Sequence, residues 1–74
     1  MNAKKYFRDN LTLYEVTFIT GENDNFIDEK PTTHTATVIF SGYWFHCISI
    51  DGKQANSLSY RSPKTATKNA YLVK

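Results

Sequence analysis

Two turn signals in the second half of the chain, Ser41-Gly42 and Asp51-Gly52, limit what the sequence can fold into. Each stands between runs that contain apolar residues, and such dipeptides favour tight turns between antiparallel strands. We expect a strand in the run between the turns, paired with a strand before it and a more polar strand after it. The sequence therefore predicts a three-strand antiparallel meander over residues 35–40, 43–50 and 54–60.

Alternation within the middle strand of this meander predicts which side chains enter the core. Trp44, Ile48 and Ile50 sustain the period of two and are the expected core residues. Tyr43 and Phe45 point to the opposite face. There they are either covered by an N-terminal helix or exposed as contacts for a partner.

Ser62-Pro63 marks the start of a C-terminal helix. Ser is favoured just before the first turn, and Pro at the first helical position has a preset φ and no N–H to leave unpaired. Ala66, Ala70 and Val73 follow at helical spacing. This narrow stripe of small side chains allows the helix to lie close on one face of the sheet.

The first half of the chain has weaker patterns. Residues 2–9 fit a short helix, residues 11–20 alternate as a strand, and residues 21–34 form an acidic loop. Together with the meander, these elements predict an α+β fold. Its antiparallel sheet has three to four strands, with a short N-terminal helix and a C-terminal helix packed on one face. The 74 residues have room for one domain, residues 1–74.

The cysteine content and the apolar stretches indicate a compartment. The single cysteine, Cys47, cannot form an internal disulfide, whereas a secreted domain of this size usually contains several. The apolar stretches are too short for a transmembrane helix or a signal peptide. We therefore expect a cytoplasmic protein that does not act on a membrane.

Residues that usually carry chemistry are sparse. His46 and Cys47 are neighbours in a strand and point to opposite faces, so they do not share a metal ion, and His34 stands at no metal-ligand spacing from them. No paired-carboxylate, nucleophile–base or glycine-rich phosphate motif is present. We expect a non-enzymatic binding protein with no catalytic residue, metal, cofactor or small-molecule substrate.

Residues 43–74 resemble the second half of the double-stranded-RNA-binding domain. The resemblance rests on the Asp51-Gly52 turn, the polar strand after it and the helix start at Ser62-Pro63. Under half of the chain is covered by it.

The resemblance implies a role for the helix start. In that family the first turn and its lysines hold phosphates across a groove, by shape rather than by sequence. Ser62, Lys64 and Lys68 are the corresponding residues here. Two features depart from the family: Pro63 stands where it usually has a lysine, and a short turn at 41–42 replaces its long groove-inserting loop.

Charge supports the same hypothesis. After Asp51 the chain has no acidic residue, which makes its C-terminal third locally basic. The first functional hypothesis is therefore that this third binds nucleic acid, either RNA or DNA. The expected contact residues are Lys53, Arg61, Ser62, Lys64 and Lys68.

The second hypothesis is a protein that binds a host protein complex. The small size, the lone cysteine and the Asn-, Lys- and Thr-rich loops are similar in character to small phage and mobile-element proteins, including anti-CRISPR inhibitors. In such an inhibitor or adaptor, the acidic loop engages a basic host surface. The expected contact residues are Glu22, Asp24, Asp28, Glu29, Tyr43 and Phe45.

Overall fold

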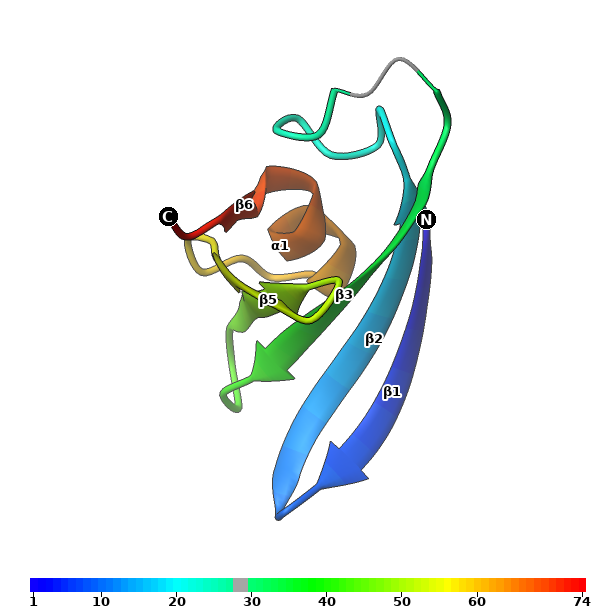
Figure 1. Ribbon diagram of the computed structural model, residues 1–74. Coiled ribbons are helices and arrows are strands. Elements are labelled where there is room, and N and C mark those ends of the chain that lie inside the picture. The colour runs from blue at the N-terminus through cyan, green and yellow to red at the C-terminus, as the bar shows by residue number, and fades with distance from the viewer. Residues whose placement is uncertain (28–29) are drawn as a thin grey trace.

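β-Strands are the predominant secondary structure. The computed structural model describes residues 1–27 and 30–74. Within these residues the elements are β1 (Asn2–Arg8), β2 (Leu11–Ile19), β3 (Thr33–Phe40), β4 (Phe45–Ile50), β5 (Lys53–Asn56), α1 (Pro63–Asn69) and β6 (Tyr71–Leu72). The six strands form one antiparallel sheet in the order β1-β2-β3-β4-β5-β6, so each strand lies beside its neighbour in sequence (Figure 1).

The predicted α+β fold with an N-terminal helix is wrong. Residues 2–8 form β1, which pairs with β2 along its whole length. The two residues between them, Asp9 and Asn10, have φ values of 51° and 65°. Asp and Asn tolerate this left-handed conformation, and two such residues in a row make the tight turn that matches the twist of a hairpin. The turn at 9–10 was the signal for a strand at 2–8 that helical spacing obscured.

The predicted meander is present with changed boundaries. The turn at Asp51 and Gly52 is confirmed, with φ values of 53° and 77°. At the other turn, Ser41 N–H donates to the Trp44 carbonyl at 2.9 Å, so residues 41–44 form the loop and the next strand begins only at Phe45. β5 ends at Asn56, and Tyr60 rejoins the sheet through a single bridge to Phe45.

A β-bulge in β4 changes which residues face the core before Ile50. Val38 pairs with Cys47 and Thr37 pairs with Ser49, which leaves Ile48 as the extra residue. Because of this insertion, Cys47 and Ile50 are both buried in the core. Ile48, which the alternation had placed in the core, is instead 38% exposed.

The core lies between α1 and the face of the sheet that curves around it (Figure 1). Ala66 and Ala70 are fully buried there against side chains such as Val16, Val38 and Ile50. The predicted C-terminal helix is therefore confirmed in position and packing. It is shorter than expected, because it ends at Asn69 and β6 follows, and Val73 lies outside the core.

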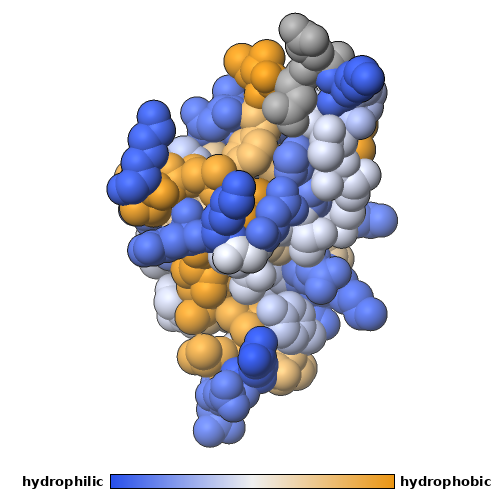
Figure 2. Space-filling view, in the orientation of Figure 1, coloured by the Kyte–Doolittle hydropathy of each residue, from blue (hydrophilic) through white to orange (hydrophobic). Residues whose placement is uncertain are grey.

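The fold also differs from the double-stranded-RNA-binding domain. A two-strand hairpin, β1–β2, stands where that domain has its first helix, so a description of the whole chain as similar to it is wrong. Figure 2 shows that hydrophobic surface on the viewed face is split into several patches separated by hydrophilic side chains.

Candidate functional site

The two ends of the sheet are built differently. We call the end with the turn at 51–52 and the described residues of the segment 19–33 the loop end. The end with the turns at 9–10 and 41–44, together with residues 60–63, is the hairpin end. The registers of β1, β2, β3 and β4 place these turns and loops at opposite ends of the strands.

At the loop end, asparagines close the C-terminus of α1. The buried Asn23 side-chain amide donates to the carbonyls of Thr67 and Ala70, and Asn25 Nδ2 donates to the same Ala70 carbonyl at 2.9 Å. Asn23 Oδ1 accepts the N–H of Asn25 at 2.6 Å. The last carbonyls of a helix lack their usual partners within it. The amides therefore satisfy the Ala70 carbonyl and add a second bond to the Thr67 carbonyl, which also accepts the Ala70 N–H at 3.3 Å.

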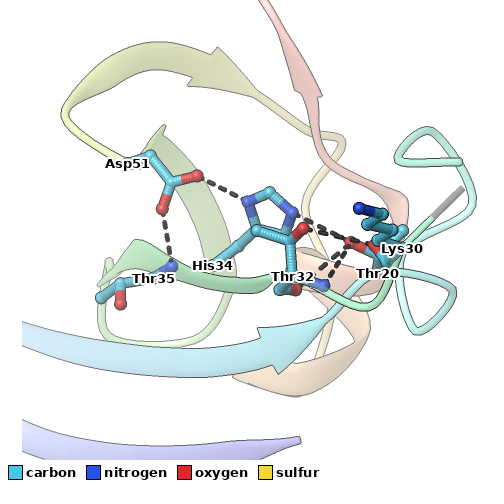
Figure 3. A network of polar contacts seen from close by, with 6 residues as sticks. All are labelled: Thr20, Lys30, Thr32, His34, Thr35 and Asp51. Carbon is cyan, nitrogen blue, oxygen red and sulfur yellow. Dashed lines mark hydrogen bonds and ion pairs between the residues drawn. The ribbon is translucent and has the colours of Figure 1, made fainter. Parts of the chain in front are cut away.

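A second polar network at the loop end joins Thr20 and His34 to the turn at 51–52 (Figure 3). His34 is buried, and its Nδ1 lies 2.6 Å from Asp51 Oδ2, while its Nε2 lies 3.2 Å from Thr20 Oγ1. Asp51 Oδ1 accepts the N–H of Thr35 at 3.0 Å. Burial raises the pKa of Asp51, but the hydrogen bonds from His34 and Thr35 outweigh it, and the pKa is lowered overall.

The Thr20 hydroxyl, the His34 imidazole and the Asp51 carboxylate are linked in the same order as the groups of a nucleophilic triad. The Thr20 hydroxyl, however, also lies 3.2 Å from the Thr32 carbonyl and accepts the Thr32 N–H at 3.3 Å. Those bonds tie together the two ends of the segment that links β2 to β3. An open cavity of about 320 Å³ at this end is lined by Met1, Asn2, Thr17, Phe18, Ile19, Glu22 and Thr33, a set that includes neither Thr20 nor His34. The contacts of this network are therefore those of a structural element that stabilises the loop end.

Glu22 and Asp24, two of the acidic residues proposed to bind a protein, lie at the loop end. The Glu22 carboxylate accepts hydrogen bonds from the Ile19 N–H at 2.9 Å and from the Met1 amino group at 2.7 Å. Both contacts lower the pKa of Glu22, and the bond from Ile19 has the larger effect. Asp24 is exposed, while its backbone N–H donates to the Lys68 carbonyl. Asp28 and Glu29 lie outside the described residues.

Aromatic side chains concentrate at the hairpin end. Of the five Phe, five Tyr and one Trp, all but Phe18, Phe26 and Tyr71 lie on the turns or strand segments of this end. The rings of Phe40 and Phe45 have centroids 4.7 Å apart, and Tyr14 meets Phe45 edge-on at 5.3 Å. The aromatic residues are thus brought together by the register of β2, β3 and β4.

Arg61 joins this cluster from the segment before α1. Its guanidinium carbon lies 4.8 Å from the Tyr43 ring centre and 5.5 Å from that of Trp44, and it donates a hydrogen bond to the Tyr43 hydroxyl. Tyr43 is 57% exposed and Trp44 is 40% exposed. The structure therefore combines Arg61, predicted to contact nucleic acid, with Tyr43, predicted to contact protein, in one surface cluster.

Two backbone hydrogen bonds hold that cluster in place. Phe45 N–H donates to the Tyr60 carbonyl at 2.7 Å, and Tyr60 N–H donates back at 2.9 Å. Arg61 directly follows this bridge, and Trp44 directly precedes it. Trp44 was missed as a site residue because unbroken alternation placed it in the core, and its position beside the turn at 41–42 was the signal for an exposed ring.

The other residues predicted to contact nucleic acid are dispersed. Lys64 is exposed in the first turn of α1, three residues after Arg61. Lys68 lies in the last turn of α1 and Lys53 follows the turn at 51–52, so both are at the loop end. Ser62 has extended backbone angles at the N-cap, but within the described part of the chain its side chain makes no capping hydrogen bond.

The remaining polar groups of residues 1–27 and 30–74 do not form a metal centre. Among the described residues, no group of three or more His, Cys, Asp and Glu side chains is arranged to hold a metal ion. Cys47 is buried, and that burial raises the pKa of its thiol to about 11 despite a hydrogen bond to the Ser49 carbonyl. A thiol with so high a pKa carries little thiolate at neutral pH and reacts slowly.

Comparison with known proteins gives no relative: no family model matches the chain, and no curated protein or solved structure matches it significantly. Over residues 1–27 and 30–74, no helix is long and apolar enough to span a membrane.

Proposed function

We propose that the hairpin end binds single-stranded nucleic acid. The observation that carries the proposal is the Arg61 guanidinium held over the exposed rings of Tyr43 and Trp44. Aromatic rings stack on bases without regard to sequence, and an arginine beside them contacts phosphates or stacks in turn. We place this activity in the cytoplasm.

The adjoining sheet surface supports a binding platform. Phe7, Thr12, Phe40, Phe45 and Tyr60 are successive cross-strand partners, so their side chains lie in one row on the face that carries α1. Four strand spacings give this row a length of roughly 19 Å. Phe7, at its outer end, is 73% exposed. A strand of nucleic acid that stacks on Trp44 and Tyr43 has room to continue along the row.

Positive charge accompanies the row at both ends. Lys5 lies over the Phe7 ring with its Nζ 5.4 Å from the ring centre, and Lys64 follows Arg61 at the other end. Each phosphate that such a side chain neutralises steepens the salt dependence of single-strand binding by roughly 0.7 in log–log slope. The platform therefore predicts binding that weakens clearly between about 50 and 200 mM salt.

Trp44 provides a direct test because it is the only tryptophan in the chain. Adding an unstructured single-stranded oligonucleotide of about 15 residues at low salt should quench its fluorescence saturably, because a base stacks on the indole. A labelled copy of the oligonucleotide should rise in anisotropy over the same concentration range. If neither signal changes at low salt, the proposal is wrong.

Matched variants localise the binding. Stacking on one aromatic residue is worth about 1–3 kcal/mol, so Tyr43→Ala should weaken binding by about fivefold or more. Arg61→Gln should weaken it and reduce the salt slope by roughly 0.7. Tyr71→Ala removes an exposed tyrosine from β6 and is the control, for which we expect no change.

A protein partner is the second candidate, and Ile27 is the observation that favours it. This side chain is 90% exposed and stands in the acidic segment after Asp24. An apolar anchor beside acidic residues suits a basic host surface with an apolar pocket, as in a phage-type inhibitor or adaptor. This candidate replaces the first if two results are found together. The oligonucleotide does not bind, and a purified partner protein binds the wild type but not Ile27→Asp.

A further inference from the structure

β1 forms an open edge of the sheet. It pairs with β2 through all seven of its residues, and in the described part of the chain no strand lies along its other side. Every second residue of such an edge directs its N–H and C=O groups outward, where another strand can pair with them. Six of the seven residues are exposed.

The side chains along this edge are strongly cationic. Within β1, Lys4, Lys5 and Arg8 carry positive charge and no residue is acidic. Lys4 faces Glu15 across the strand pair, whereas Lys5 and Arg8 face Tyr14 and Leu11. Asp9 follows Arg8 in the turn, so the edge itself keeps at least two cations without a cross-strand carboxylate.

We propose that the outer edge of β1 takes up an acidic, extended peptide segment of a partner protein by strand addition. The backbone of that segment pairs with the outward N–H and C=O groups of β1. Its side chains lie directly across from those of β1, on the same faces. Opposite charges across a strand pair are favourable, and like charges are unfavourable.

The register of β1 sets the side-chain pattern of the segment. Lys4, Tyr6 and Arg8 share one face, and Lys5 and Phe7 share the other. The best partner segment therefore places acidic side chains across from residues 4, 5 and 8 and apolar side chains across from residues 6 and 7. In an antiparallel segment the order along the partner chain is reversed.

A second copy of β1 fits this edge poorly. In an antiparallel pair centred on Tyr6, Lys4 faces Arg8, and in one centred on Lys5, two lysines meet. Such like-charge pairs oppose self-association through this edge. Charge complementarity therefore selects an acidic partner over a second copy of the chain.

The experiment uses the full chain and a labelled peptide, Thr-Glu-Val-Val-Glu-Glu-Thr, which carries the antiparallel pattern. We expect a rise in anisotropy with added protein. Two N-methylated forms of the peptide, one modified at its odd residues and the other at its even residues, have the same charge as the parent. They locate the backbone contacts, because N-methylation removes the N–H donor of each modified residue. Strand addition predicts that one form loses binding by about tenfold or more while the other keeps it. Equal binding by both forms, or no binding of the parent peptide, overturns the proposal.

Protein variants locate the edge. Lys5→Glu combined with Arg8→Glu should weaken peptide binding at least about tenfold. Lys30→Glu combined with Lys74→Glu makes the same change in net charge outside β1 and is the control, for which the affinity should stay within about twofold of wild type. Tyr43→Ala should have no effect on the peptide, which separates peptide binding at β1 from nucleic-acid binding at the Arg61 cluster. Equal losses in the two charge variants, or dimerisation through β1 in sedimentation, overturn the proposal.

Discussion

The loop end and the hairpin end of this sheet use polar and aromatic groups in opposite ways. At the loop end, amide, imidazole and carboxylate groups are paired with backbone and with one another, as in the contacts of Asn23, His34 and Asp51. At the hairpin end, rings and a guanidinium meet at the surface and stay exposed. Paired polar groups stabilise the fold, whereas exposed aromatic and cationic groups are available to a partner.

The difference has a structural cause. α1 is only seven residues long and cannot cover the whole sheet, so other groups are needed to close its ends. The segment after β2 folds back on the helix C-terminus and closes the loop end. The short turns of the hairpin end supply no such cover, which leaves Tyr43, Trp44 and Phe7 exposed. The two ends are therefore expected to respond differently to substitution.

The largest expected effect on stability is at Asn23. Asn23→Ala removes three hydrogen bonds of a buried side chain, to the Thr67 and Ala70 carbonyls and from the Asn25 N–H. It should lower the free energy of unfolding by about 3 kcal/mol, since each such bond contributes about 1 kcal/mol. Urea denaturation measures this change. Asn25→Ala is the control and should cost less, because the Ala70 carbonyl then keeps its bond from Asn23. Equal small losses in both variants would show that the cap is unimportant.

The Asp51 network should give a pH-dependent stability. Because the folded-state pKa of Asp51 is lowered, its contribution is present above the unfolded-state pKa of about 3.9 and is lost as pH falls through the folded-state value. Asp51→Asn should therefore lower stability at neutral pH by about 1 kcal/mol and flatten its acid dependence in part, since Glu22 titrates in the same direction. An unchanged pH profile in urea denaturation would contradict this role.

The labelling rate of the Cys47 thiol reports how often the core between the two ends opens. With its pKa raised to about 11, the thiol should react with a disulfide reagent at pH 8 only when the protein opens. We expect the labelling rate to rise in Asn23→Ala and to stay near the wild-type rate in Tyr43→Ala. Rapid labelling of the native wild-type protein would show that the core is accessible.

The smallest expected effect on stability is at the hairpin end. An exposed cation–π contact is worth about 0.5–1 kcal/mol, so Arg61→Gln should change the free energy of unfolding by no more than about 1 kcal/mol. Urea denaturation beside Asn23→Ala makes the contrast. A loss as large as that of Asn23→Ala would show that the Arg61 cluster is structural.

The sequence predicts the second half of the fold better than the first. The turn at 51–52 and the helix after Pro63 depend on local backbone chemistry, and both are confirmed. β1 was misread because seven residues with mixed cations and apolar side chains also fit a helix, and its identity as a strand depends on pairing with β2. The turn at Asp9 and Asn10 was the local signal for that pairing, and the helical spacing obscured it.

The candidate site was predicted in parts. Arg61 and Tyr43 were both singled out, but for different partners, because they are far apart in sequence and only the Phe45–Tyr60 bridge brings them together. Trp44 was assigned to the core because the alternation was extended through residues 41–44, which form the loop before β4. The predicted phosphate site at Ser62 is the weakest part, because a two-turn helix has little dipole to attract an anion.

The central claim is that the hairpin end binds while the loop end stabilises, and an amide ¹H–¹⁵N titration with a single-stranded oligonucleotide tests it most directly. Saturable shifts at residues 5–8, 40–46 and 59–65, with residues 19–27 and 66–70 unchanged, are the predicted result. Shifts confined to the loop end, or no shifts at low salt, would contradict the account.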